Sequence, residues 1–484
     1  MYMSIPKFSF FLFVLFLFYS CGDPEKKELS NANILFILAD DQSFNTIAEL
    51  GNEEVRTPSL DELARTGTVF TSVYNMGGWN GAVCIASRTM FNTGRFLWNA
   101  HEVDQKLDSL ANAGQLWSQL MQANGYDTYM TGKWHVKINP EKIFTTVGTK
   151  RPGMPGDTPE GYNRPLSMDD WEWTPWDSAY GGFWEGGTHW SELVANETIT
   201  FLDSASVSTK PFFMYIAFNA PHDPRQSPKK YVDMYPLEAI SVPVNFMSEY
   251  PYKEKIGCGW SLRDERLAPM PRSEYSVKVN RQEYYAIITH MDHQIGRIIE
   301  HLEKTGQKEN TYIFFTADHG LACGNHGLMG KQNMYEHSLK PPMIIVGPDI
   351  PKGEKRDVNV YLQDIMPTVL DYAGTEIPDY IEFSSLKEMI DDIKTESTYP
   401  GIYGAYKNHQ RMIRMNRYKL IAYPFEGVLR LFDLEKDPME MNDLATIPKY
   451  QNKVDSMYFA LRKLQREMND TLQLDNFTFS QLSH

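Results

Sequence analysis

The sequence predicts an α/β sandwich with a largely parallel central sheet, followed by a smaller C-terminal subdomain with an antiparallel sheet. Three runs, residues 33–39, 212–218 and 312–316, have the length of strands and are almost continuously apolar. Strands that are buried on both faces show this pattern, which is typical of parallel sheets covered by helices. Stretches with helical spacing separate the runs, as crossover connections in such a sheet require.

The other elements of the first part follow from local patterns. Residues 59–65 have helical spacing and a serine that signals a helix cap. A second amphipathic helix at residues 116–123 precedes a short strand at residues 127–131. Residues 281–302 form a long helical pattern, and residues 343–346 are one more short apolar strand. This alternation of strands and helices supports the sandwich.

The pattern changes in the last quarter of the chain. Residues 411–423 and 428–434 alternate more regularly and are rich in Tyr, Arg and Lys, as expected of an antiparallel sheet with one solvated face. A terminal helix is predicted to run to about Leu472. We therefore predict a main domain at residues 32–366 and a C-terminal subdomain at residues 367–484.

Composition limits the classes of function. A chain of 484 residues is long enough for two or more domains, and a hydrophobic content of 42% fits a folded protein. The net charge of -15 argues against nucleic acid as the main partner. An anionic ligand must then be attracted by a local site, because the surface as a whole is acidic.

The N-terminus has the pattern of an export signal. Residues 8–19 are apolar apart from one serine, which suits a signal peptide and is short for a bilayer span. The following Ser-Cys pair resembles the lipobox of bacterial lipoproteins, although aromatic residues precede it. We predict a signal peptide at residues 1–21, lipidation at Cys21 and a polar tether at residues 22–31. The alternative is a cleaved secretory signal with an incidental cysteine, and both readings predict export, to the periplasm, the outer membrane or the cell surface.

The four cysteines fit an exported protein but leave one question open. Apart from Cys21 and Cys84, only Cys258 and Cys323 remain. These two could pair in an oxidising compartment, which a single sequence does not decide. The sequence contains no CxxC motif and no Cys/His spacing typical of zinc.

Acidic residues follow two of the predicted buried strands. Asp40 and Asp41 come after the first, and Asp318 and His319 come after another. Either pair alone would be an ordinary strand-end turn. The carboxyl ends of parallel strands meet at one edge of a sheet, and hard cations need several oxygen ligands from separate segments. The four side chains therefore predict a divalent metal site, although an imidazole also suits transition metals.

Four further segments carry reactive or basic residues. Cys84 lies in the stretch GAVCIASR, which is too small and mixed for a core strand, although a lone cysteine is usually a small buried hydrophobe. Lys133 and His135 follow a predicted strand, His222 follows another, and Lys331 follows the second acidic pair. Any one of these residues alone would be an ordinary turn residue.

Taken in chain order, these segments resemble the active site of the type I formylglycine-dependent sulfatases of the alkaline phosphatase superfamily. The chain looks most like bacterial carbohydrate sulfatases similar to iduronate sulfatase. The resemblance spans residues 33–444 and implies an alkaline-phosphatase-like sandwich, with residues 32–366 as the catalytic domain. It implies removal of sulfate from a sulfated poly- or oligosaccharide. The chain departs from the commonest pattern at His319, where many members have Asn, and at Ala86, where the usual motif has Pro.

The resemblance implies a modified nucleophile and a bound metal. A maturation enzyme would oxidise Cys84 to formylglycine, whose hydrated form attacks sulfur with one hydroxyl and expels sulfate with the help of the other. Arg88, one helical turn later, would hold the hydrated aldehyde by charge-assisted hydrogen bonds. Calcium is the implied metal, held together with the modified Cys84 by Asp40, Asp41, Asp318 and His319.

The resemblance also implies roles at the sulfate group. Lys133 would bridge the sulfate and the formylglycine, and His135 would act as a base, as a histidine near neutral pKa can. His222 would contact the sulfate and protonate the leaving oxygen. Lys331 would hold a sulfate oxygen as a point charge.

Clues to the substrate are weaker. Five tryptophans crowd one glycine-containing, loop-like stretch, where they would stack on sugar rings or pack on each other as a lid: Trp171, Trp173, Trp176, Trp184 and Trp190. His189, Arg225 and Gln226 are candidates for reading a carboxylate or hydroxyl beside the sulfate. Arg225 in particular could pair with the carboxylate of a uronic acid.

Two other functions remain open. One is a phosphomonoester or phosphonate hydrolase on the same fold, which usually has a Thr or Ser nucleophile and a second metal. The other is a catalytically silent, glycan-binding lipoprotein. A comparison of sulfate and phosphate esters separates the first from a sulfatase, and glycan binding without sulfate release would indicate the second.

Overall fold

The computed structural model describes residues 1–3, 32–162, 167–170, 172–393 and 395–482. The chain divides into two units, Met1–Ser30 and Asn31–His484, and the sheets and helices given below belong to the second unit. The predicted lipidation site Cys21 and the predicted tether lie outside the described residues. Within the described ranges, none of the helices combines the length and the apolar character that a bilayer crossing needs.

An eight-stranded sheet forms the centre of the fold. Its strands lie in the order β12-β2-β11-β10-β1-β9-β5-β6, and only β11 runs antiparallel to its neighbours. The prediction of a largely parallel sheet is therefore confirmed. The bounds of its strands are β1 Asn33–Ala39, β2 Thr68–Phe70, β5 Asp127–Lys133, β6 Thr146–Arg151, β9 Phe212–Ala217, β10 Thr311–Ala317, β11 Met343–Val346 and β12 Glu354–Arg356.

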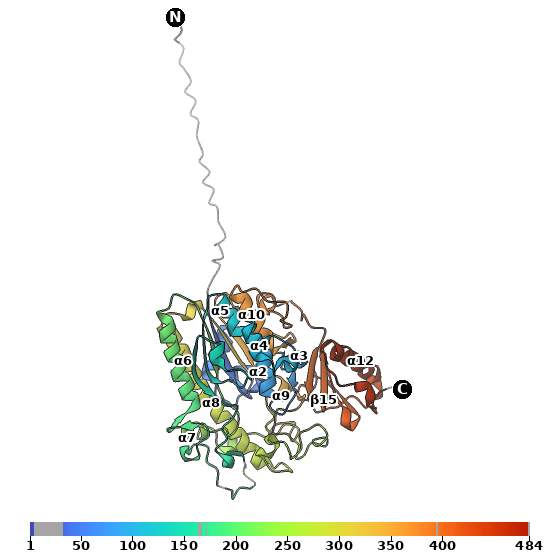
Figure 1. The fold of residues 1–484 in the computed structure, drawn as a ribbon. Coiled ribbons are helices and arrows are strands. Elements are labelled where there is room, and N and C mark those ends of the chain that lie inside the picture. The colour runs from blue at the N-terminus through green and yellow to red at the C-terminus, as the bar shows by residue number, and fades with distance from the viewer. Residues whose placement is uncertain (4–31, 163–166, 171, 394, 483–484) are drawn as a thin grey trace. The chain divides into compact units, whose positions relative to one another are not determined.

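Helices cover both faces of this sheet (Figure 1). On β1, Phe36 packs against Trp117 on one face, with ring centroids 5.1 Å apart, whereas Ile37 belongs to the core on the other face with Met291. Burial on both faces explains why β1 has no polar alternation. One face carries α1 (Pro58–Thr66), α6 (Trp190–Ser206) and α8 (Glu274–Lys304), and the other carries α2 (Val83–Thr93), α5 (Trp117–Ala123) and α10 (Ile365–Tyr372).

Shorter elements complete the main part of the chain. Two pairs of very short strands are β3 (Val73–Tyr74) with β13 (Val360–Tyr361) and β7 (Trp184–Glu185) with β8 (Thr188–His189). The remaining short helices are α3 (Leu97–Val103), α4 (Leu107–Asn112), α7 (Lys229–Val232), α9 (Glu336–Leu339) and α11 (Lys387–Asp391).

Helix α1 is capped differently from the prediction. The helix begins at Pro58, so Ser59 lies inside it, and no side chain of the N-cap residue Thr57 closes the end. Instead the carboxylate of Asp292 on α8 accepts hydrogen bonds from the backbone N–H groups of Ser59 (3.1 Å) and Leu60 (2.8 Å). Burial raises the pKa of Asp292 to about 7. The N-terminus of α1 is thus capped by a residue more than two hundred positions away in the sequence, where the prediction expected a local serine.

The C-terminal subdomain is built on a second sheet. Four antiparallel strands, β14 Ile402–Tyr406, β15 Gln410–Met415, β16 Tyr418–Tyr423 and β17 Val428–Asp433, are joined at one edge by β4 (Gly77–Gly78), which comes from the main domain and runs parallel to β14. Helix α12 (Gln451–Glu467) packs on this sheet and ends before Leu472 (Figure 1). Strand β4 therefore ties the subdomain to the segment just before α2.

The described cysteines are thiols. Cys84, Cys258 and Cys323 are all buried, and in the described part of the chain no disulfide joins any of them. The pairing that the sequence left open for Cys258 and Cys323 does not occur in this structure.

Candidate active site

The carboxyl ends of three parallel strands bring predicted residues together. Asp40 and Asp41 follow β1, Asp318 and His319 follow β10, and Lys133 is the last residue of β5. Because β10, β1, β9 and β5 are consecutive and parallel, these ends meet at one edge of the sheet. The backbone N–H of Asp41 donates to Asp318 Oδ1 at 3.2 Å, which joins the two acidic segments directly.

The acidic side chains form a set that fits a divalent cation. One ligand atom from each of Asp40, Cys84, Asp318 and His319 lies within 4.8 Å of the others, and all four residues are buried. Asp40 Oδ1 accepts no hydrogen bond within the described structure. Burial and the neighbouring Asp318 raise the pKa of Asp40 well above its ordinary value. Buried carboxylates this close together are stabilised by a cation, and calcium takes carboxylate oxygens from several segments.

Helix α2 brings Cys84 and Arg88 to this cluster. Cys84 is the second residue of the helix, and Arg88 lies one turn later on the same side, as expected. Arg88 donates from Nε to Asp318 Oδ2 (3.0 Å) and from Nη1 to the backbone oxygen of Lys133 (2.6 Å). Cys84 Sγ lies 3.4 Å from His135 Nδ1. The guanidinium of Arg88 therefore fixes α2 against the ends of two strands.

The surroundings of Cys84 differ from those of an ordinary core cysteine. Burial raises the pKa of the Cys84 thiol, but Lys133, Lys331 and a hydrogen bond with His135 outweigh burial and hold this pKa well below its usual value. Cys258 is equally buried, yet burial and nearby acids raise the pKa of its thiol well above the usual value. Electropositive surroundings mark reactive cysteines, and apolar ones mark inert cysteines.

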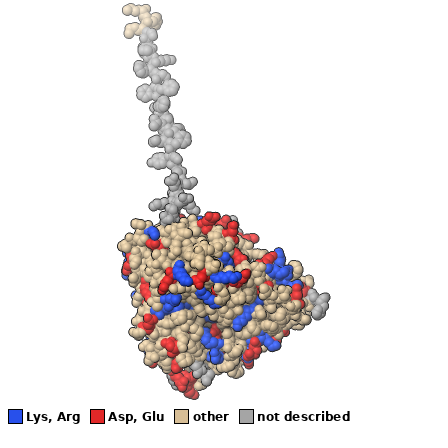
Figure 2. Space-filling model, in the orientation of Figure 1, with Lys and Arg blue, Asp and Glu red and all other residues tan. Residues whose placement is uncertain are grey.

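Two buried lysines supply the local positive charge. Lys133 Nζ bonds Asp40 Oδ2, and Lys331 Nζ lies 2.8 Å from Asp41 Oδ1. Their side chains are at most 2% exposed. The outer surface mixes acidic and basic side chains, and neither sign dominates the face shown in Figure 2. The two lysines therefore make the site attractive to an anion although the protein as a whole is acidic.

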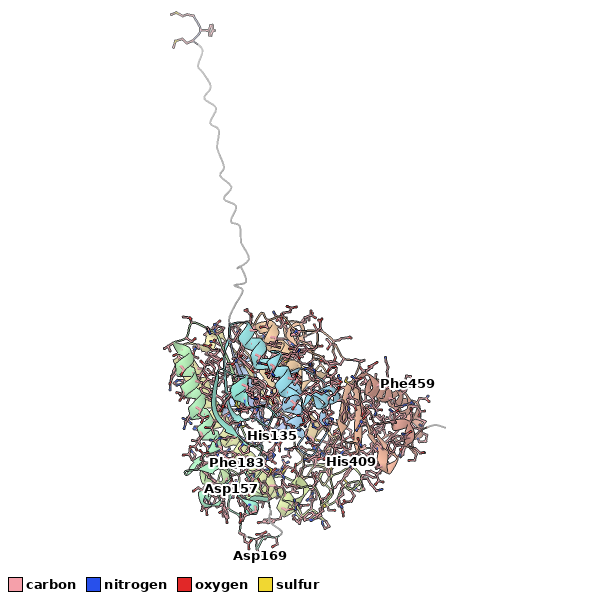
Figure 3. All side chains as sticks on the ribbon, viewed as in Figure 1. His135, Asp157, Asp169, Phe183, His409 and Phe459 are labelled. Carbon is pink, nitrogen blue, oxygen red and sulfur yellow. The ribbon has the colours of Figure 1, made fainter. Side chains whose placement is uncertain are left out.

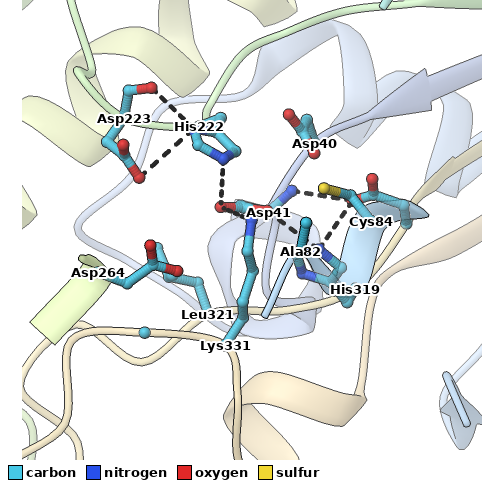
Figure 4. A network of polar contacts seen from close by, with 12 residues as sticks. Asp40, Asp41, Ala82, Cys84, His222, Asp223, Asp264, His319, Leu321 and Lys331 are labelled. Carbon is cyan, nitrogen blue, oxygen red and sulfur yellow. Dashed lines mark hydrogen bonds and ion pairs between the residues drawn. The ribbon is translucent and has the colours of Figure 1, made fainter. Parts of the chain in front are cut away.

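His222 is held by two residues that the sequence did not predict as part of the site. Its Nδ1 donates to the backbone oxygen of Asp223 at 2.7 Å, and Nε2 lies 3.7 Å from Asp41 Oδ2 (Figure 4). The Asp223 carboxylate in turn accepts from Arg263 Nη1 at 2.5 Å. Burial, together with Lys331 and Lys133, lowers the pKa of His222 well below its ordinary value. The Asp directly after His222 was a signal for this arrangement, whereas nothing in the sequence pointed to Arg263.

The end of β5 depends on a glycine. Gly132 has φ +93°, and a Cβ added there would lie 1.8 Å from the backbone oxygen of Ala217 on β9. Only glycine lets the two strands approach this closely where Lys133 enters the site.

We expect Gly132→Ala to destabilise the fold by about 3 kcal/mol or more, because a left-handed backbone and a clash with backbone add together. Gly125→Ala is the matched control, since Gly125 has φ +86° but nothing within 4 Å of the added Cβ. The control should cost only about 1 kcal/mol. Urea unfolding of both variants measures the difference, and equal losses would show that the contact with Ala217 is unimportant.

Arg225 does not face open solvent. It is fully buried, donates from Nη1 to Asn280 Oδ1 at 2.8 Å, and lies 5.4 Å from the ring centroid of Tyr284. The hydroxyl of Tyr284 donates to the backbone oxygen of Asp41 at 2.6 Å. Arg225 therefore lies near Tyr284, whose hydroxyl contacts the segment that carries Asp41, and its Nε and Nη2 atoms have no hydrogen-bond partner within the described residues.

The other two predicted substrate residues cross-link loops. Both ring nitrogens of His189 are engaged, since Nδ1 accepts from the Ser191 N–H (3.1 Å) at the start of α6 and Nε2 lies 2.9 Å from the backbone oxygen of Gln226. The side chain of Gln226 accepts from the Phe183 N–H at 2.7 Å and donates to the Gly181 oxygen at 3.0 Å. These contacts hold the tryptophan-containing stretch to the main domain, and they leave His189 no polar atom for a ligand.

The predicted tryptophan loop is only partly a loop. Trp190 is the first residue of α6, Trp184 lies in β7, and Trp173 packs against Tyr180 with ring centroids 5.1 Å apart. Trp171 lies outside the described residues. At least one tryptophan of this stretch, Trp173, therefore packs against another aromatic ring of the same stretch.

Comparison with known proteins shows similarity over most of the chain. The family model "Sulfatase" matches residues 32–375, and the model "N-sulphoglucosamine sulphohydrolase, C-terminal" matches residues 324–467. An arylsulfatase of Clostridium perfringens is 30% identical over 87% of this chain and 92% of its own length.

Two solved structures show the same fold. A protein in complex with its substrate D-glucosamine-2-N,6-O-disulfate has a TM-score of 0.71 at 22% identity, covering 91% of this chain and 99% of the other. The phosphonate monoester hydrolase of Agrobacterium radiobacter has a TM-score of 0.68 at 19% identity, covering 90% and 96%.

The family model covers most of the chain, and the arylsulfatase matches nearly its full length. The chain therefore belongs to the sulfatase family of the alkaline phosphatase superfamily and is a sulfuric ester hydrolase.

Proposed function

We propose that this sulfatase removes sulfate from a sulfated carbohydrate, with Cys84 converted to formylglycine and with a calcium ion held beside it. The observation that carries the proposal is the position of Cys84. Its Sγ lies among the buried side chains of Asp40, Asp318 and His319, next to two buried lysines. A neutral, unreactive cysteine is not stabilised by the charged side chains around it, whereas these side chains can stabilise charge that develops in a reaction.

The metal and the modified residue would each supply one kind of chemistry. Hydrated formylglycine supplies a hydroxyl nucleophile for attack on sulfur. A divalent cation lowers the pKa of a neighbouring hydroxyl and neutralises charge on sulfate oxygens. Asp40, Asp41, Asp318 and His319 would hold the cation, since their oxygens and imidazole fit it.

The remaining side chains would bind the sulfate and move protons. Lys133 and Lys331 would hold sulfate oxygens, because both ammonium groups lie near Cys84 and away from solvent. His135 Nδ1, 3.4 Å from Cys84 Sγ, would take a proton from the group at position 84. His222 is held with Nε2 toward the cluster, where a bound anion would favour its protonated form and so proton donation to the leaving oxygen.

The support for a carbohydrate substrate comes from the names of similar proteins. One family match is to the C-terminal region of N-sulphoglucosamine sulphohydrolase, and one structural neighbour binds a disulfated glucosamine. Both ligands are sulfated sugars, so we infer the same class for this chain.

Maturation and location complete the proposal. A formylglycine-generating enzyme would act on the stretch around Cys84, which has Ala86 in place of the usual Pro. The apolar N-terminal run followed by Cys21 supports export and lipid anchoring. If Cys21 is lipidated, wild-type protein will partition with membranes and Cys21→Ser will not.

The function is tested by comparing esters of sulfate and phosphate with the same leaving group. We expect matured protein to cleave 4-nitrophenyl sulfate at least about 100-fold more efficiently than 4-nitrophenyl phosphate, because one extra negative charge on phosphate is poorly tolerated beside three carboxylates. Preference for phosphate or for a phosphonate monoester would instead support the hydrolase alternative. Release of sulfate from glucosamine 6-sulfate or from glycosaminoglycan oligosaccharides would then identify the sugar.

A further inference from the structure

A hollow of about 740 Å³ lies next to the segment that leads into α2. We call it the aromatic hollow and define it by Trp79, Trp98, His101, Lys407, His409 and Phe425, which are among the residues that line it. The first three come from the main domain, and the last three come from turns of the C-terminal sheet. None of these residues belongs to the catalytic cluster around Cys84.

The rings of the aromatic hollow are held in place. Trp79 stacks on His101 with centroids 4.9 Å apart and an interplanar angle of 19°. Trp98 donates from Nε1 to the Tyr403 hydroxyl at 3.1 Å, and the Arg411 guanidinium lies 5.2 Å from its ring centroid. These contacts fix the rings before any ligand arrives, and a preformed surface binds with a smaller entropy cost.

The aromatic hollow is tied to the active site through Gln332, the neighbour of Lys331. The side chain of Gln332 donates to the backbone oxygen of Gly81 at 2.8 Å, two residues after Trp79 and three before Cys84. The side chain of Gln410 donates to the backbone oxygen of Gln332 at 2.8 Å, and Gln410 directly follows His409. Both walls are therefore anchored to the residue beside a sulfate-binding lysine.

The chemistry of the lining fits a sugar ring. Flat aromatic side chains provide apolar faces, and the amide of Asn408 lies among them as a donor and acceptor for hydroxyl groups. Lys407 and Glu102 add one charge of each sign to the lining, and Lys407 can pair with a sulfate or carboxylate group of the sugar. A lipid or an apolar peptide would offer the Asn408 amide and these two charges no polar partner, which costs binding free energy.

We propose that the aromatic hollow binds a second sugar unit of the chain whose sulfated unit lies at Cys84. This inference rests on the proposed carbohydrate sulfatase function and extends it, because it makes the enzyme prefer an oligosaccharide to a single sulfated sugar.

The test measures binding without turnover, in protein carrying Cys84→Ala. The probes are tetrasaccharides from heparin and from chondroitin sulfate, with glucosamine 6-sulfate as the single-sugar reference. Two variants of the aromatic hollow are measured. One is Trp98→Ala, and the other is a double variant that carries both His409→Ala and Phe425→Ala. The matched control is Phe459→Ala, since Phe459 is a 65% exposed aromatic residue on α12 outside the aromatic hollow (Figure 3).

The aromatic-hollow variants should bind the better tetrasaccharide about tenfold more weakly, which corresponds to about 1.4 kcal/mol. Their affinity for glucosamine 6-sulfate and the affinities of the Phe459→Ala control should not change. Equal tetrasaccharide affinity in all proteins, or no preference for a tetrasaccharide over the single sugar, would overturn the proposal. Hydrolysis of 4-nitrophenyl sulfate by the same variants with Cys84 restored reports separately on the active site. A result that refutes sugar binding in the aromatic hollow can therefore be distinguished from a result that refutes the proposed sulfatase function.

Discussion

Cys84→Ala will abolish sulfate release, with a loss in kcat of roughly 10⁴-fold to 10⁶-fold, the scale on which removal of a catalytic nucleophile acts. The substitution removes the only atom at this position that can be oxidised to an aldehyde, and it leaves the acidic cluster and both lysines in place. Initial rates with 4-nitrophenyl sulfate measure the loss.

The matched control for this prediction is Cys258→Ala. Cys258 is as buried as Cys84 and donates from Sγ to the backbone oxygen of Gln332 at 3.1 Å, but its surroundings raise its thiol pKa. The control should lose about 1 kcal/mol of stability at most and keep its kcat. Near-normal activity of Cys84→Ala would contradict the assigned nucleophile.

Asp40→Asn will remove both calcium-dependent stabilisation and most activity. Asp40 lies among the four grouped ligands, and its Oδ1 is buried without a hydrogen bond in the described structure. We expect chelation to lower the Tm of the wild type by several degrees and calcium to restore it, because a ligand that binds only the folded state stabilises it by about 2.7 kcal/mol at 100 times its Kd. The Tm of the variant should respond to neither treatment, and its kcat should fall about 10³-fold.

Asp127→Asn is the control for the metal prediction. Asp127 begins β5, at the opposite end of the strand from Lys133, and pairs with Lys210 at 3.3 Å near the surface. This variant should keep both the calcium response and the activity. A calcium response of Asp40→Asn equal to that of the wild type would show that the cation binds elsewhere.

The sequence was sufficient for five of the eight strands of the central sheet, β1, β5, β9, β10 and β11, and for the acidic residues after β1 and β10, whereas β2, β6 and β12 were missed. Because β1, β9 and β10 are buried on both faces, they are almost continuously apolar, so an apolar run alone identifies them. Once these strands are parallel neighbours, the residues after them must meet. This is why Asp40 and Asp318 could be brought together from positions 278 residues apart.

Features that depend on distant partners were beyond the sequence. The cap of α1 is Asp292, and the support of His222 is Arg263 through Asp223, and neither follows from local spacing. The strands β4 and β14 were also missed. β4 consists of two glycines and has no side-chain pattern, so its pairing with β14 is visible only in three dimensions.

The orientations of the predicted substrate residues were beyond the sequence for a related reason. A sequence shows which side chains a loop carries but not which way they point. The ring of His189 turns back to cap α6, and Arg225 turns inward to Asn280. The partners of these side chains are Ser191 on α6, Gln226, and Asn280 on α8, and no local sequence pattern indicated either orientation.

The most direct test of the account is the mass of the tryptic peptide Thr66–Arg88 from protein made in its native host. The account predicts the mass of formylglycine in place of Cys84, in a fraction of molecules that matches the fraction of active enzyme. A fully active preparation in which this peptide carries only unmodified cysteine would contradict it.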